Sequence, residues 1–248
     1  GWTVTDVTPD QPVILRGQFH SRISKSVHDP LLATALALEG NGAQTIIMSC
    51  DRVSIPGALA ARVGEALRAA LPGFDPANLI ISATHTHTAP ETEDGIYPEP
   101  PPGVMQPTAY ADFLVKRLTE AAVSAWQRRA PGGVNWAYSQ AVVGHNRRVQ
   151  YVGGVARMYG QTDQPDFECI EGYEDHGVDL LFTWDADAQL TGVVINLACP
   201  SQVTEGEEYV SADFWHEVRE ELGRRHGAGL FVLPQCSAAG DQSPHLLV

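Results

Sequence analysis

The stretch Leu79-Ile80-Ile81-Ser82-Ala83-Thr84-His85-Thr86-His87-Thr88 places two histidines, two residues apart, directly after an apolar run. The run is short and branched, and prolines flank it at Pro76 and Pro90, a pattern typical of a buried strand. If the extended conformation continues, residues i and i+2 point the same way, so both imidazoles are expected on one face at the strand's carboxyl end. Open α/β sheets build their sites at that end, and neutral imidazole is the commonest protein ligand of metal ions. The alternative is that two polar residues simply end a strand.

The composition is that of an acidic globular protein. The 248 residues are 44% hydrophobic and 19% charged, and the formal net charge of −14 argues against nucleic-acid binding through a basic surface. No apolar run approaches the roughly 18 residues of a membrane span, so we expect no transmembrane segment. Four cysteines without C-x-x-C spacing are too sparse for a disulfide scaffold. The chain begins at Gly1 without an initiator Met, and we expect a fragment or a processed form of a longer protein.

Strand-like and helical patterns alternate along the chain. Asn41-Gly42 is a hairpin signal between two strand-like segments, and an apolar residue every fourth position after Pro56 predicts a helix. Strands are expected at residues 31–39, 45–48, 79–82, 134–143, 178–184, 190–197 and 230–233. Further helices are expected after the N-caps Thr108 and Ser211, and loops or irregular chain at residues 90–107, 144–158 and 163–175. The predicted class is α/β, one layered domain over residues 1–248 with a mixed β-sheet flanked by helices.

Four of these apolar runs end in reactive side chains: Ser49-Cys50-Asp51, His85 with His87, residues 196–201, and residues 235–244. Where neighbouring strands are parallel, their carboxyl ends gather at one edge of the sheet. The four endings therefore predict a shared pocket.

The last of these segments contains a candidate nucleophile. The small residues 238–240 allow the backbone to approach a ligand closely, and Asp241 and Ser243 follow them. A serine hydroxyl needs a base or a metal to help remove its proton, and a metal held by His85 would serve, or would activate water instead. The alternative is a Gly-Asp turn in which Ser243 caps the next element.

Taken in order, these motifs resemble the neutral ceramidases, the neutral/alkaline non-lysosomal ceramidase family, in the amino-terminal catalytic domain. The motifs that carry the resemblance are Asp6-Val7-Thr8-Pro9, Val27-His28-Asp29-Pro30-Leu31, Ser82 to Pro90 with its double histidine, Asn146-Arg147, Ser211-Ala212-Asp213 and Gly240-Asp241-Gln242-Ser243-Pro244. They cover nearly the whole chain.

The resemblance implies a zinc-dependent amidase that cleaves the N-acyl bond of ceramide, a sphingolipid, to a fatty acid and a sphingoid base. It implies that His85 is a zinc ligand, that His87 and Arg147 line the site, and that Ser243 takes the place of the active-site serine, with Asp241 beside it. A bound zinc ion would polarise the amide carbonyl, and backbone donors near Gly240 would stabilise the oxyanion. It also suggests a lipid or small-molecule substrate, peripheral contact with a membrane, and export from the cell.

The sequence departs from the family at the second zinc histidine. The corresponding segment is Asn196-Leu197-Ala198-Cys199-Pro200-Ser201-Gln202, and two further family ligands, a Glu and a Tyr, would lie beyond Val248. Cys199 is a candidate replacement because thiolate binds zinc well, although a small buried cysteine is the favoured interpretation. Weaker candidates, each more often structural, are His28, Asp51, Asp213 and His216.

Three functions stay open at the level of sequence. The first is a hydrolase of N-acyl amides. The second is a relative with changed chemistry that acts on a polar glycan or an ester, which suits the acidic loops at residues 91–99 and 163–175. The third is a binding module without catalysis, which suits the absent histidine.

Overall fold

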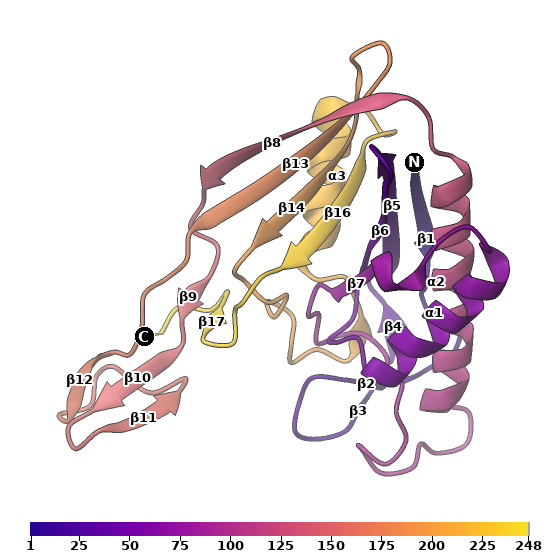
Figure 1. Ribbon diagram of the computed structural model, residues 1–248. Coiled ribbons are helices and arrows are strands. Elements are labelled where there is room, and N and C mark those ends of the chain that lie inside the picture. Colours follow the sequence, from indigo (N-terminus) through magenta and orange to yellow (C-terminus); the bar gives the residue numbers. More distant parts are fainter. Residues whose placement is uncertain (248) are drawn as a thin grey trace.

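A computed structural model describes residues 1–247, in which two four-stranded mixed sheets face each other, with two helices on the first sheet and one against the second (Figure 1). The predicted α/β class is confirmed, with the strands divided between two sheets. No helix within residues 1–247 is long and apolar enough to cross a membrane.

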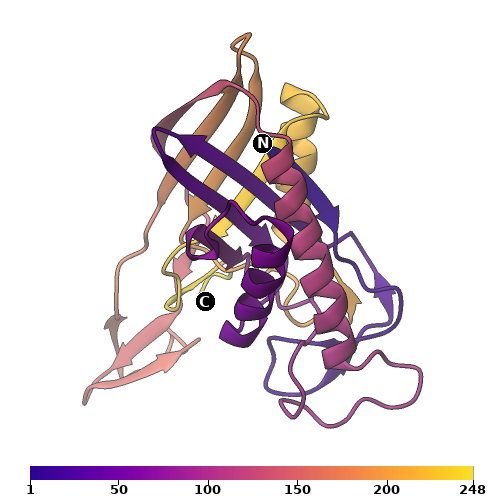
Figure 2. The same cartoon turned by 45° about the vertical axis from the view of Figure 1, so that its right-hand side comes forward.

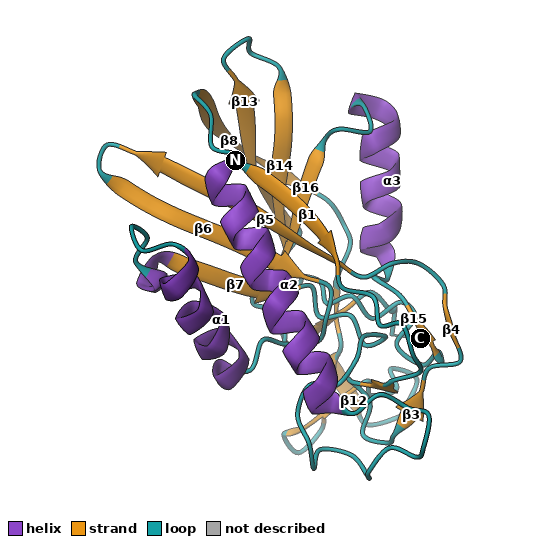
Figure 3. Ribbon diagram, turned by 90° about the vertical axis from the view of Figure 1, so that its right-hand side faces the viewer, coloured by secondary structure: helices purple, strands orange, loops and turns teal. Residues whose placement is uncertain are grey.

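The first sheet has the order β1-β5-β6-β7, formed by β1 (Trp2–Asp6), β5 (Leu32–Gly40), β6 (Ala43–Cys50) and β7 (Leu79–Ala83). The β5–β6 hairpin turns at Asn41 and Gly42, whose φ angles of 51° and 78° confirm the predicted turn. Helix α1 (Gly57–Ala70) carries the chain from β6 to β7, which pair in parallel. Together with α2 (Pro107–Gln127), it covers one face of this sheet (Figure 3).

The second sheet has the order β16-β14-β13-β8, formed by β8 (Gly132–Gln140), β13 (Gly177–Asp185), β14 (Leu190–Leu197) and β16 (Phe231–Cys236). The antiparallel β13–β14 pair forms a second hairpin, built from two of the predicted strands. Helix α3 (Phe214–His226) then carries the chain to β16, which is parallel to β14. Each sheet is thus built on a hairpin, a crossover helix and a parallel strand.

The two sheets touch through a small apolar cluster. Trp2, Leu36, Val194 and Leu233 are buried there, and the indole of Trp2 donates to Thr183 Oγ1 at 2.9 Å. Nearby, the sheets enclose an open cavity of about 1060 Å³ lined by strand residues and by residues 128–134. This cavity is lined by none of the predicted site residues, so a large cavity volume does not by itself locate the chemistry.

Short strands complete the fold, and a three-stranded sheet stands out from the body on the side away from α1 and α2 (Figures 1 and 2). Its strands are β10 (Arg148–Tyr151), β11 (Val155–Met158) and β12 (Phe167–Ile170). The two-stranded pairs are β2 (Ile14–Leu15) with β3 (Arg22–Ile23), β4 (Ser26–Val27) with β15 (Tyr209–Val210), and β9 (His145–Asn146) with β17 (Gln242–Ser243). The expectation of irregular chain at 144–158 and of loop throughout 163–175 is therefore wrong.

Two predicted helix starts are also wrong by a few residues. Helix α2 begins at Pro107, because proline suits the first helical position and Gln106 is the N-cap. Helix α3 is capped by Asp213, whose carboxylate accepts from Phe214 N at 2.8 Å. Ser211 instead donates to the buried carboxylate of Asp29.

Candidate active site

The chain after β7 leaves the extended conformation at His85. Its φ is 67°, in the left-handed region that is uncommon for a non-glycine residue. The expectation that both histidines project by strand alternation is therefore wrong. His85 is held by two bonds to the segment after β6: its N–H donates to Arg52 O at 2.9 Å, and its Nδ1 lies 2.7 Å from Val53 O.

Burial favours the neutral imidazole of His85, and the contact with Val53 decides which of its two nitrogens carries the proton. Burial lowers the pKa of His85 below its ordinary value, and the adjacent His87 lowers it further. Because a carbonyl oxygen accepts a proton at Nδ1, Nε2 carries the lone pair. This is the state of a histidine that accepts a hydrogen bond or binds a metal ion.

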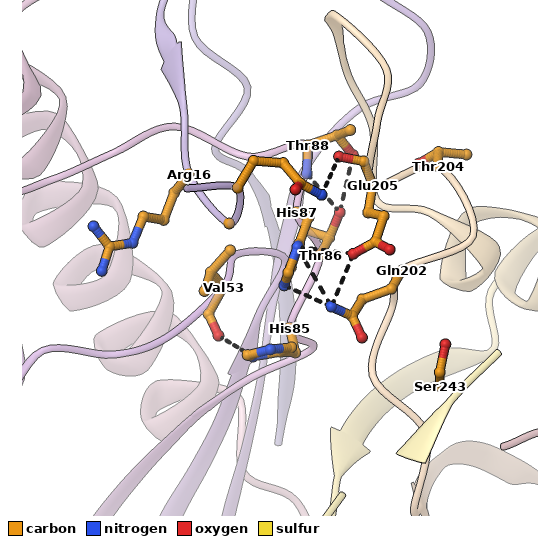
Figure 4. A network of polar contacts seen from close by, with 12 residues as sticks. Arg16, Val53, His85, Thr86, His87, Thr88, Gln202, Thr204, Glu205 and Ser243 are labelled. Carbon is orange, nitrogen blue, oxygen red and sulfur yellow. Dashed lines mark hydrogen bonds and ion pairs between the residues drawn. The ribbon is translucent and has the colours of Figure 1, made fainter. Parts of the chain in front are cut away.

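His87 lies against His85 and is almost completely buried. The two rings meet edge to face with their centroids 5.0 Å apart. Gln202 Nε2 donates to His87 Nε2 at 3.0 Å, and His87 Nδ1 lies 3.3 Å from a carboxylate oxygen of Glu205 (Figure 4). His87 therefore has an imidazole–carboxylate contact on one side and an amide donor on the other.

Glu205 connects this imidazole to a third histidine, since His245 Nε2 lies 3.7 Å from its second oxygen. Burial raises the pKa of the Glu205 carboxyl, but the hydrogen bond and charge of His87, together with His245 and Arg147, outweigh burial and hold the pKa below its ordinary value. Glu205 is thus an anion beside His87.

A second chain of hydrogen bonds leads from Gln202 to Ser243. Arg147 Nη1 donates to Gln202 Oε1 at 3.2 Å and to Tyr159 Oη at 3.0 Å. The Tyr159 hydroxyl donates in turn to Ser243 Oγ at 3.3 Å. The His245 backbone N–H also donates to Ser243 Oγ, at 3.1 Å. In the view of Figure 4, Gln202 lies between the two histidines and Ser243.

The structure therefore joins His87, Arg147 and Ser243 in one polar network and packs the His85 ring against His87, whereas Cys199 lies in other surroundings. Asp241 adjoins the network through its backbone oxygen, which accepts from Arg147 N at 2.8 Å. The Asp241 carboxylate accepts from Asn146 Nδ2 at 3.0 Å, a contact between the segments that form β17 and β9.

Cys199 is fully buried in an apolar cluster with Leu197 and Trp215. Burial raises the pKa of its thiol to about 12, whereas a metal ligand must be the thiolate. Cys199 as a metal ligand stays a prediction, and its surroundings favour the structural role.

The weaker candidates have structural partners. Asp51 is fully buried and forms a two-bond ion pair with Arg219 of α3. Asp213 caps α3 and also accepts from Thr204. His28 lies 4.9 Å from the ring of Tyr209, centroid to centroid.

A metal site would be expected from the family resemblance. Within residues 1–247, however, no group of three or more His, Cys, Asp or Glu side chains is arranged to hold a metal ion. Zinc in proteins takes three or four protein ligands. The donor set in this part of the chain therefore does not fit zinc by itself.

The sequence interpretation missed four residues of the network: Tyr159, Gln202, Glu205 and His245. Gln202 and Glu205 closely follow residues 196–201, already identified in the sequence as a polar ending of an apolar run, so their position could have been predicted. Tyr159 had none, because its place depends on the β10–β11 hairpin.

No protein-family model and no curated protein matches the sequence. Two solved structures match almost the whole chain. A structure described as "Ceramidase complexed with C2" is 19% identical, with a TM-score of 0.76 over 98% of this chain. The neutral ceramidase from Pseudomonas aeruginosa is 21% identical, with a TM-score of 0.79 over 99% of this chain. The matched region is 38% and 39% of the length of those chains. The resemblance to neutral ceramidases is therefore confirmed at the level of the fold, and this chain has the fold of about two fifths of such a protein.

Proposed function

We propose that this site belongs to a hydrolase that cleaves an N-acyl amide bond, as in ceramide, to a carboxylic acid and an amine. The observation that supports the proposal is the convergence of His87, Arg147 and Ser243 from three separate segments into one hydrogen-bonded network, with the His85 ring packed against His87. The ceramidase-like fold supports the choice of an acyl amide as substrate.

In the proposed reaction, Ser243 Oγ bonds to the acyl carbon, and its proton goes to the amine that leaves. Water then cleaves the acyl ester, which releases the carboxylic acid and restores the serine. His87 and Glu205 form the imidazole–carboxylate pair that such proton transfers use. In the free protein, His87 Nε2 accepts from Gln202, so the substrate must displace this amide before Nε2 can take a proton.

Arg147 has a positioning role in this proposal. Its guanidinium donates to Gly240 O at 2.9 Å, three residues before the serine, and to Gln202 beside His87. One fixed cation thus joins the serine segment to the histidine segment.

Zinc remains a separate proposal that rests on the resemblance. His85 would contribute one ligand and Cys199 stays a candidate for another, and because no group of three or more possible ligands exists within residues 1–247, a further ligand would be needed. Metal analysis of the full-length protein tests this: about one zinc per chain that is lost on His85→Ala supports it, whereas metal content unchanged by His85→Ala removes His85 from any metal site.

Hydrolysis of a ceramide with a fluorescent acyl chain tests the amidase proposal. Ser243→Ala and His87→Ala should each lower kcat by about 10³-fold or more. His226→Ala, at the last position of α3, is the matched control and should retain activity. Full activity in both site variants would refute the proposal. Absence of cleavage of amides, esters and glycosides by the wild type would favour the binding module.

A further inference from the structure

Strained backbone gathers around the proposed site. Within residues 1–247, five non-glycine residues have positive φ: Asn41, His85, Tyr159, Ala188 and Asp213. Asn41 and Ala188 lie in the two hairpin turns, where this conformation is ordinary. The other three lie outside hairpin turns, and His85 belongs to the site. Such conformations persist where surrounding contacts enforce them, and they concentrate at functional sites.

Tyr159 is the one of these residues whose contacts lead directly to Ser243. Its φ is 53°, and its backbone N–H donates to Arg147 O at 2.6 Å. The chain is also close-packed immediately afterwards, because a Cβ at Gly160 would lie 2.6 Å from Tyr151 Oη. The backbone is therefore fixed on both sides of the ring's attachment point.

The Tyr159 side chain is fixed as well. Arg147 Nη1 donates to the phenol oxygen at 3.0 Å, and the guanidinium carbon lies 5.3 Å from the ring centroid. The phenol donates to Ser243 Oγ at 3.3 Å. A cation thus donates to the oxygen whose own proton points at the serine, and such a chain makes the O–H a stronger donor.

We propose that Tyr159 is a further catalytic residue, whose hydroxyl donates a hydrogen bond to the oxyanion that forms beside Ser243. The proposal rests on the hydrolase function above. When Ser243 Oγ bonds to the acyl carbon, the negative charge develops on an oxygen attached to that same carbon. The Tyr159 hydroxyl is already within hydrogen-bond distance of Oγ, so a small rotation of its O–H bond directs the proton to that oxygen while the ring stays in place. Tyr159 keeps its proton throughout, so the step adds a hydrogen bond and transfers no atom.

The variant Tyr159→Phe tests this in the full-length protein, because it removes the hydroxyl and keeps the ring. The expected result is a fall in kcat of about 10²- to 10³-fold, with KM for the fluorescent ceramide changed much less. Tyr173→Phe is the matched control, because its side chain is 81% exposed on a neighbouring loop, and it should leave kcat unchanged. An unchanged melting temperature separates the effect from misfolding.

A fluorophosphonate probe gives a second readout that needs no natural substrate. The probe phosphonylates a nucleophilic serine, and it forms a similarly charged oxygen. Tyr159→Phe should slow labelling of Ser243, and Ser243→Ala should abolish it. If Tyr159→Phe keeps the kcat and the labelling rate of the wild type while Ser243→Ala is inactive, the proposed role of Tyr159 is overturned and the hydrolase mechanism is not. Full activity in Ser243→Ala would overturn the hydrolase mechanism as well.

Discussion

The buried ion pair between Asp51 and Arg219 should be a main attachment of α3 to the first sheet. Asp51 follows β6 and is fully buried, and its oxygens accept from Arg219 Nη1 and Nη2 at 2.7 and 3.0 Å. The same carboxylate accepts from the backbone N–H of Leu32 at 2.9 Å. Asp51→Asn keeps the shape of the side chain and an oxygen that accepts from the backbone N–H of Leu32, but it removes the negative charge opposite Arg219.

The magnitude follows from the burial of the two partners. Breaking a buried pair by removing one charge costs about 3–5 kcal/mol. The Arg219 side chain is 11% exposed and retains some access to water, which favours the lower end of that range. For a domain of this size, about 3 kcal/mol corresponds to a melting temperature lowered by roughly 6–12 °C.

Thermal melts followed by circular dichroism test this, with Glu221→Gln as a matched control. Glu221 pairs with Arg224 and Arg225 on the exposed side of the same helix, so its loss should have little effect. Arg219→Met should destabilise more than Asp51→Asn, because it leaves a fully buried carboxylate unpaired. A melting temperature for Asp51→Asn within about 2 °C of the wild type would refute the argument.

Three further predictions concern the site and the thiols. Gly17→Ala should lower activity and stability, because the added Cβ would lie 2.4 Å from the His87 ring and residue 17 has a φ of +124°. Gly206→Ala is the control and should be neutral, because a Cβ there meets open space. Equal activity of the two variants would contradict the packing argument. Because the folded-state pKa of His85 is lowered, the folded protein binds fewer protons than the unfolded chain, and stability should fall as the pH drops through about 6.5. Urea unfolding at several pH values should show a smaller fall for His85→Gln, and an identical fall would be inconsistent with this burial effect. Burial raises the thiol pKa of Cys50, Cys199 and Cys236 to about 11 or 12, whereas Cys169 is exposed. A maleimide near neutral pH should therefore modify Cys169 first. Mass spectrometry that finds early modification of one of the three buried thiols would count against this prediction.

Local signals predicted the larger elements well. The Asn41-Gly42 turn and the apolar spacing after Pro56 each reappear as the expected hairpin and helix, and α1 buries Leu59, Val63 and Leu67. The strand β10 was missed because only two of its four residues, Val149 and Tyr151, are fully buried, and charged and polar residues alternate with them. A strand so short acquires its structure from pairing on both sides, which a single segment does not reveal.

The motifs predicted some of the residues that lie together, namely His85, His87, Arg147 and Ser243, and the conformations of these residues came from tertiary contacts. His85 was expected in an extended chain, yet bonds to Arg52 O and Val53 O hold it at positive φ. Glu205 and Tyr159 join the network because loops from separate sheets end beside it. Residue type and spacing therefore predicted several residues that lie together at the proposed site, whereas the groups that orient them depend on the packing of the whole chain.

The site's position follows from the repeated hairpin, helix and parallel strand in the two sheets. The chain after β7 carries the histidines, the chain after β14 carries Gln202 and Glu205, and the chain after β16 carries Ser243. Ser201 joins two of these endings, since its hydroxyl donates to Thr84 O at 2.7 Å, one residue before His85. Arg147 joins the third through Gly240 O. Because each sheet supplies only part of the network, the angle between the sheets sets the geometry of the proposed site, and contacts that fix this angle hold that geometry as well as stabilising the fold.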